Sequence, residues 1–89
     1  MAINFDLNDL LAFRAVAELS NFRKAAESVH LSQPAFSRRI DKLEQALGVR
    51  LLERSTRRVS LTTVGRDFER KVRELLDELD TTLLSIRGV

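Results

Sequence analysis

The chain has 89 residues, of which 44% are hydrophobic and 31% are charged, so its composition predicts one small soluble domain. The absence of cysteine and the presence of a single histidine, His30, exclude disulfides, thiolate sites and histidine clusters, and no metal or cofactor is expected. No uncharged run approaches the ~20 apolar residues of a membrane span, and residues 1–6 carry an acid but no base, unlike a signal peptide. The expected compartment is the cytoplasm, with no membrane partner.

The basic residues gather in the middle of the chain. The net charge is +2, but residues 21–60 hold nine basic and four acidic residues, whereas residues 1–20 and 61–89 are each net negative. A local basic field of this kind is typical of a protein that faces a polyanion, although a solvated basic surface is the ordinary alternative. Nucleic acid is therefore a candidate partner.

Two helices are predicted before residue 30. Apolar residues recur with a helical period from Leu7 to Leu19, and Asp6 is placed to cap the first turn. Asn21 is placed to cap a second, short helix from Phe22 to Val29, whose small residues allow another helix to approach closely.

A third helix is predicted from the cap residue Ser32 to about Leu47, with Pro34 in its first turn and Gly48 as its C-terminal stop. Only a short turn separates it from the second helix, which is typical of a helix-turn-helix, although helical hairpins in bundles look similar. The apolar side of this helix consists of Phe36, Ile40, Leu43 and Leu47, and its opposite face consists of Pro34, Arg38, Asp41 and Gln45.

The exposed side of the third helix carries residue types that read DNA. Arginine can bond a guanine edge, glutamine can bond an adenine edge, and an α-helix fits the major groove. Gln33, Ser37 and Arg38 are the base-reading candidates, while Arg39 and Lys42 are candidates for backbone contacts. A solvated face is the alternative, but the spacing of the two helices and the charge of the mid-chain favour DNA. No catalytic arrangement surrounds His30, so an enzyme is not predicted.

A β-hairpin is predicted between Val49 and Thr62, where two short apolar segments flank a polar turn. Three arginines lie at or near its tip, namely Arg54, Arg57 and Arg58. A basic hairpin that follows a helix-turn-helix is typical of a wing, and we expect at least one of these arginines to enter a minor groove.

The last predicted helix runs from Thr63 to about Ile86, so at ~1.5 Å per residue it would be about 35 Å long. Its apolar residues alternate spacings of four and three, as in the seam between paired helices. The dimerisation candidates are Phe68, Val72, Leu75, Leu76, Leu79, Leu83 and Ile86. The first turns of this helix can also pack on the preceding helices, whereas nothing in the chain is left to cover its last turns, around Leu79, Leu83 and Ile86. The expected domains are therefore a DNA-binding part over residues 1–62 and a linker and dimerisation helix over residues 63–89.

The run from Asn21 to Ile40 resembles the N-terminal domain of LysR-type transcriptional regulators, and so do the motifs that follow it over the rest of the chain: Leu43-Glu44, Leu47-Gly48, Leu51-Leu52-Glu53-Arg54 and Leu61-Thr62-Thr63-Val64-Gly65. Arg23 departs from the family, which usually has threonine there, and Leu52 stands where phenylalanine is common. The resemblance implies a mainly α fold: a winged helix-turn-helix of three helices and a two-stranded hairpin, followed by a long dimerisation helix.

The resemblance also implies a function and a set of contacts. The protein would be a transcriptional regulator that binds double-stranded DNA at a partly palindromic promoter site with a T…A half-site pattern. It would act as a homodimer, and as a tetramer in the full-length protein. A C-terminal effector-binding domain normally follows; it is expected to be absent here, and any effector would bind there. The residues implied to face bases are Gln33, Pro34, Ser37 and Arg38; those implied to touch phosphates are Asn21, Phe22, Arg23, Lys24 and Ser32; and Arg54 or its wing neighbours would enter the minor groove.

Two other functions stay open from the residues alone. Winged helices sometimes bind proteins, so the chain could be a protein–protein module, and it could also be a winged helix from a different regulator family. A steep loss of DNA binding with salt would exclude the first, and the position of the dimer interface would distinguish the second.

Overall fold

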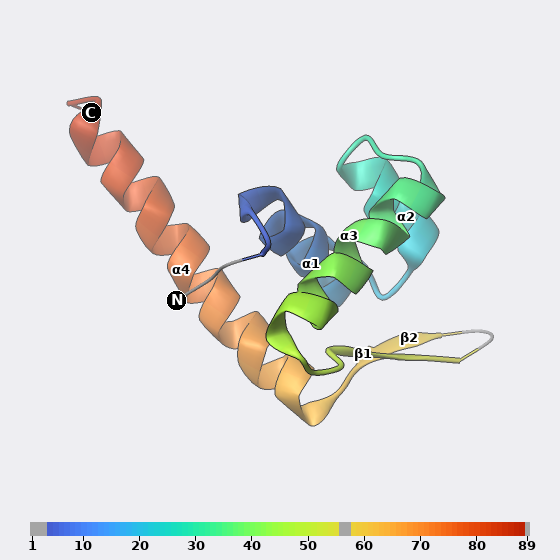
Figure 1. The fold of residues 1–89 in the computed structure, drawn as a ribbon. Coiled ribbons are helices and arrows are strands. Elements are labelled where there is room, and N and C mark those ends of the chain that lie inside the picture. Colours follow the sequence, from blue (N-terminus) through green and yellow to red (C-terminus); the bar gives the residue numbers. More distant parts are fainter. Residues whose placement is uncertain (1–3, 56–57, 89) are drawn as a thin grey trace.

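The computed structural model describes residues 4–55 and 58–88, so Arg57, one of the three predicted wing arginines, lies outside the described residues. The elements, in chain order, are α1 (Leu7–Leu19), α2 (Phe22–Ser28), α3 (Gln33–Leu47), β1 (Leu52–Arg54), β2 (Val59–Leu61) and α4 (Thr63–Ile86). The predicted winged fold is confirmed, although α2 ends one residue earlier than expected. In Figure 1, α4 and the hairpin leave the helical core in different directions, and the molecule measures 47 × 29 × 20 Å.

A side-chain cap starts each of these helices. The cap oxygen accepts a hydrogen bond from the backbone N–H three residues further on, at 2.8–3.2 Å, which satisfies a donor that the first helical turn leaves free. The caps of α1, α2 and α3 are the predicted ones, Asp6, Asn21 and Ser32, and the cap of α4 is Thr62. Gly48 ends α3 in the left-handed conformation, with φ of 72°, as its position in the sequence indicated.

The core lies where α1, α2, α3 and the first half of α4 meet. Its buried apolar residues are Ala12, Phe13, Val16, Ala25, Ala26, Phe36, Ile40, Leu43, Leu51, Leu52, Val72 and Leu76. The rings of Phe13 and Phe68 lie 5.4 Å apart and join α1 to α4, while Phe22 meets Phe36 edge-on at 5.7 Å and joins α2 to α3. The second of these contacts holds α3 against α2. In the described part of the chain, no helix combines the length and the hydropathy that crossing a membrane requires.

The turn between α2 and α3 depends on a left-handed residue. His30 has φ of 60°, and the N–H of Leu31 donates to the carbonyl of Ala26 at 3.0 Å, which closes the end of α2. This geometry reverses the chain within residues 29–32, so α3 can start almost at once. His30 thus has a structural role at the end of α2.

The start of α4 is attached closely to the segment that enters the hairpin. The Thr62 N–H donates to the Leu51 carbonyl at 3.0 Å, and the Thr62 hydroxyl donates to the Arg50 carbonyl at 2.7 Å. A Cβ atom at Gly65 would overlap the Leu51 carbonyl oxygen, so the backbones approach this closely only because residue 65 is glycine. These contacts hold the first turn of α4 against the segment that enters the hairpin.

Candidate nucleic-acid interface

The N-terminal half of α3 presents the predicted base-reading residues together. Because Phe36 and Ile40 are buried, the opposite side of the helix faces solvent. Gln33, Pro34 and Arg38 are exposed there, and Ser37 is half-buried. Arg38 forms no ion pair within residues 4–55 and 58–88, so its guanidinium group can bond a base edge. The structure thus brings the four residues onto one face.

The first turn of α2 adds exposed basic side chains. Arg23 and Lys24 are exposed, and Arg23 lies 3.6 Å from Glu27 in a solvated ion pair of little energetic weight. Asn21 is occupied as the cap of this helix. Phe22 is half-buried and packs on the α3 side chains, which is a structural role that its place in the predicted phosphate-binding region did not indicate.

Arg54 anchors the hairpin to the helices. Its guanidinium nitrogen Nη2 lies 3.0 Å from Oδ1 of Asp41 and 3.5 Å from Oε1 of Glu44. Its carbon Cζ lies 5.0 Å from the centre of the Phe22 ring, within the range of a cation–π contact. Arg58, by contrast, is exposed next to the tip of the hairpin. The prediction that a wing arginine enters a minor groove therefore stays with Arg58, and with Arg57, which the structure does not describe.

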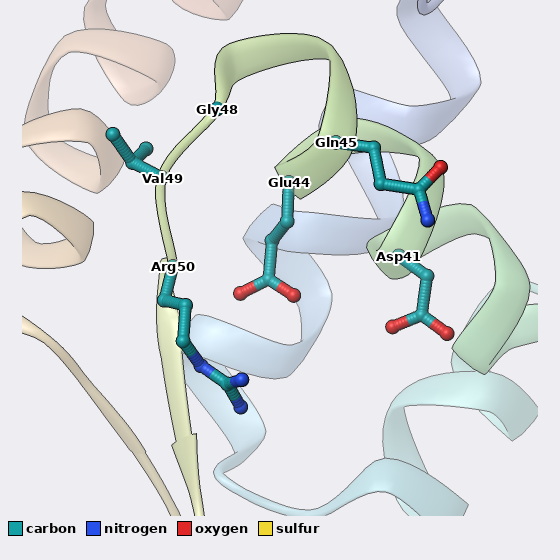
Figure 2. A pocket seen from close by; sticks show the side chains of 6 residues that line it. All are labelled: Asp41, Glu44, Gln45, Gly48, Val49 and Arg50. Carbon is teal, nitrogen blue, oxygen red and sulfur yellow. The ribbon is translucent and has the colours of Figure 1, made fainter.

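The pocket at the C-terminal end of α3 is a joint between elements (Figure 2). Oε2 of Glu44 accepts hydrogen bonds from the N–H groups of Leu51 at 2.7 Å and Leu52 at 3.2 Å, which ties the start of the hairpin to α3. No cluster of metal-binding side chains occurs among the residues that the structure describes. The pocket is lined by Asp41, Glu44, Gln45, Gly48, Val49 and Arg50.

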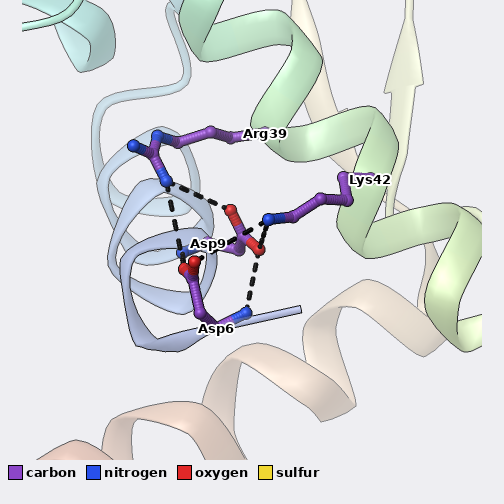
Figure 3. A network of polar contacts seen from close by, with 4 residues as sticks. All are labelled: Asp6, Asp9, Arg39 and Lys42. Atoms are coloured by element: carbon purple, nitrogen blue, oxygen red, sulfur yellow. Dashed lines mark hydrogen bonds and ion pairs between the residues drawn. The ribbon is translucent and has the colours of Figure 1, made fainter. Parts of the chain in front are cut away.

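Arg39 and Lys42 lie on the side of α3 that faces α1, and they pair with acids there (Figure 3). Nη1 of Arg39 lies 3.4 Å from Oδ1 of Asp9, and Nζ of Lys42 lies 2.9 Å from Oδ2 of the same carboxylate. Asp6 lies within 3.9 Å of both cations. We call these four residues the Asp9 cluster. The sequence contained a signal for it, because each pair is spaced by three residues on its helix, but nothing showed that the two faces meet.

Asp9 is the buried charge of this cluster. Its side chain is 0% exposed, and its carboxylate also accepts a hydrogen bond from the Asp6 N–H at 3.0 Å, which completes a reciprocal capping box. Burial alone would raise the pKa of Asp9, but the hydrogen bonds from Lys42, Asp6 and Arg39 and the charge of Lys42 together lower it. The contact with Asp9 in turn raises the pKa of Lys42. Asp9 and Lys42 are therefore both ionised at neutral pH.

The dimerisation candidates on α4 fall into two groups. Val72 and Leu76, at 1% and 5% exposed, are buried in the core of this same chain, and Phe68 packs on α1. These three are consequently not free for a partner, because the first turns of α4 complete the domain. The remaining candidates form what we call the apolar stripe: Leu75, Leu83 and Ile86, which are exposed, and Leu79, which is half-buried.

Comparison with known sequences identifies a family and close relatives. The family model described as "Bacterial regulatory helix-turn-helix protein, lysR family" matches residues 7–66. The "Uncharacterized HTH-type transcriptional regulator YbhD" of Escherichia coli K12 is 44% identical over 84 residues, covering 94% of this chain and 26% of that protein. The "SDS degradation transcriptional activation protein" of a Pseudomonas species is 54% identical over 72 residues, covering 81% of this chain and 24% of that protein. The chain thus spans about a quarter of the length of these relatives.

Solved structures with the same fold include complexes with DNA. The BenM DNA-binding domain bound to catB site 1 DNA has a TM-score of 0.91 and 37% identity, covering 94% of this chain and 93% of that chain. The CbnR DNA-binding domain in complex with DNA has a TM-score of 0.90 and 38% identity, covering 94% of this chain and 97% of that chain.

Proposed function

Because this chain belongs to the LysR family of bacterial regulatory helix-turn-helix proteins and forms the DNA-binding domain of that family, we propose that it reads a promoter site with α3 in the major groove. The observation that carries this proposal is the exposed face of α3, where Gln33, Ser37 and Arg38 project away from the core. These side chains match the donors and acceptors of base edges, and an α-helix fits the groove. Pro34 lies beside them, where its apolar ring can contact a thymine methyl group.

Backbone contacts would come from both sides of this face. Lys24 at the start of α2 and Ser32 at the start of α3 are exposed, so they can bind phosphates and fix the register of α3 on the duplex. Arg58 on the hairpin would lie by the adjacent minor groove, with Arg54 holding the hairpin in place. In this arrangement α3 contacts the bases, and the elements on either side of it contact the DNA backbone.

We further propose that two chains pair through the apolar stripe of α4. Its exposed side chains include Leu83 at 45% and Ile86 at 79%, and no other described part of this chain covers them. A partner helix would remove that surface from water. Two-fold symmetry would then place two α3 helices on successive turns of the duplex, as a partly palindromic site requires. In a longer protein, two such dimers would form a tetramer that acts on the chromosome in the cytoplasm.

Selection of bound sequences from a random DNA pool tests the proposal directly. We expect enrichment of a partly palindromic site with a T…A pattern in each half, and an affinity that falls steeply with salt as phosphate contacts release counterions. If no sequence is enriched and binding does not respond to salt, the chain is a protein–protein module and not a reader of DNA.

A further inference from the structure

The Asp9 cluster balances its charges within the protein. Asp9 offers one carboxylate oxygen to each cation, with Oδ1 facing Arg39 and Oδ2 facing Lys42, and Asp6 repeats this arrangement at longer range. Two acids, one on α1 and one at its N-cap, thus oppose two bases on α3. All four side chains meet in one place, as Figure 3 shows.

The positions of these acids matter because they border the reading face. Asp6, Arg39 and Lys42 line an open pocket together with Arg38, so the negative charge of α1 lies beside the base-reading side of α3. Arg38 is outside the cluster and pairs with none of its acids. Among the neighbouring basic residues of α3, Arg39 and Lys42 are therefore paired with acids from the start of α1, whereas Arg38 is not.

From this geometry, and building on the DNA-binding function proposed above, we propose that Asp9 is a fixed counter-ion that withholds Arg39 and Lys42 from DNA phosphates and so limits non-specific binding. For Lys42 to reach a phosphate, it would have to leave a carboxylate that is 0% exposed. A buried charge that loses its partner is strongly unfavourable. The sequence alone had suggested both cations as backbone contacts, and the geometry assigns them to the protein.

The counter-ion would favour specific over non-specific sites. Non-specific affinity depends on the number of phosphates neutralised, and each contact contributes about 0.9 to the slope of log K against log salt. Between about 50 and 200 mM salt, one contact changes the affinity by about threefold. Withholding two cations therefore lowers binding to any duplex, whereas the hydrogen bonds of Arg38 and Gln33 with bases are left as they are.

The test measures how the affinity of the full chain for a random-sequence duplex depends on salt, by fluorescence anisotropy. Arg39→Gln and Lys42→Gln should leave the slope unchanged, whereas Lys24→Gln, which removes an exposed base, should reduce it by about 0.9. Asp9→Asn should steepen the slope by about 1–2, because it releases one or both cations to phosphates. Asp77→Asn, an exposed acid on α4, changes the net charge by the same amount and should leave the slope unchanged.

Each outcome has a distinct meaning. If Arg39→Gln and Lys42→Gln flatten the slope as Lys24→Gln does, both cations bind phosphate and the counter-ion role is wrong, while DNA binding itself stands. If Asp9→Asn has no more effect than Asp77→Asn, the role is equally wrong. A wild-type chain without salt-dependent binding would instead overturn the proposed function. Should Asp9→Asn fail to fold by circular dichroism, the two glutamine variants, whose side chains are partly exposed, decide the question.

Discussion

Arg38 and Arg39 are neighbours in the sequence, yet the structure gives them opposite surroundings. One residue along an α-helix is a rotation of about 100°, and that rotation takes Arg38 to the solvent side and Arg39 to the side of α1. Arg38 is exposed, whereas Arg39 is half-buried against Asp6 and Asp9. The sequence predicted the first environment from the apolar side of α3, but the second depends on residues thirty positions away.

Replacing Arg38 by alanine should weaken binding to the selected site by about 1–3 kcal/mol and relax the preference at one base position, because a bidentate contact with a guanine edge is lost. The measurement is a binding titration against the site and against its single-base variants. Arg39→Gln serves as the control and should keep the base preference. Equal weakening of Arg38→Ala on specific and random DNA would show that this residue contacts only phosphate.

The lowered pKa of Asp9 leads to a prediction of how the stability of the fold responds to acid. The pKa of Asp9 is lowered in the folded chain. The free energy by which its ionised carboxylate stabilises the fold is therefore fully present above the unfolded pKa of about 3.9, and it is lost as the pH falls through the folded pKa. Asp9→Asn should cost about 1–3 kcal/mol at neutral pH, since it removes hydrogen bonds to a charged group. It should also make the free energy of unfolding less dependent on pH below about 5.

Denaturant unfolding at a series of pH values checks this expectation. Asp67→Asn, which breaks the exposed pair with Arg70 on α4, is the control and should change stability little. A variant Asp9→Asn that loses stability in acid as steeply as the wild type would show that the pH dependence has another source.

At the scale of elements, what could be predicted were the local features. The starts of α1, α2 and α3 were predicted because Asp6, Asn21 and Ser32, residue types that cap free N–H groups, stand before the periodic apolar segments. Gly48 marked the end of α3 because glycine readily adopts the left-handed conformation. The close packing of elements was not predictable in this way. The contacts of Arg54 with Asp41 and Glu44, and the burial of Val72 and Leu76, depend on how α3, α4 and the hairpin cross, which periodicity within one element does not specify.

Gly65→Ala tests the joint between the hairpin and α4. Alanine is the better helix former by about 1 kcal/mol, but its Cβ would overlap the Leu51 carbonyl oxygen, which is backbone and cannot turn aside. We therefore expect a net loss of about 1–3 kcal/mol, as in other overpacked sites. Thermal or denaturant unfolding measures it, and an increase in stability would mean that the contact is looser than the structure shows.

At the scale of the whole molecule, α4 serves two purposes along its length. Its first half completes the core through Phe68, Val72 and Leu76, and its second half projects beyond the domain with the apolar stripe exposed. The sequence predicted that the first turns of this helix pack on the rest of the domain and that nothing in the chain is left to cover the last turns. The described residues show this division, because α1 covers only the part of α4 that lies beside the domain.

Leu83→Lys places a charge in the exposed part of the stripe while sparing the core. It should give a folded monomer by sedimentation, with much weaker binding to a site with two halves and little loss on a single half-site. Thr81→Lys, on another face of α4, adds the same charge and should remain dimeric. If the wild type is itself monomeric at micromolar concentration, or if Leu83→Lys binds the full site as well as the wild type does, α4 is not the interface.

The joint formed by Thr62, Gly65 and Leu51 affects the angle at which α4 leaves the domain, and so the geometry of the proposed pair of chains. With 24 residues at ~1.5 Å each, α4 is about 36 Å long, so a small change of angle at its start displaces its far end by several times as much as a point near the start. A tilt of about ten degrees at its base moves the far end by about 6 Å, nearly two base pairs at ~3.4 Å each. If two chains pair through α4 as proposed, the distance between their α3 helices depends on this joint. Gly65, which lies outside the proposed reading face, would then affect which spacing of half-sites the pair can span.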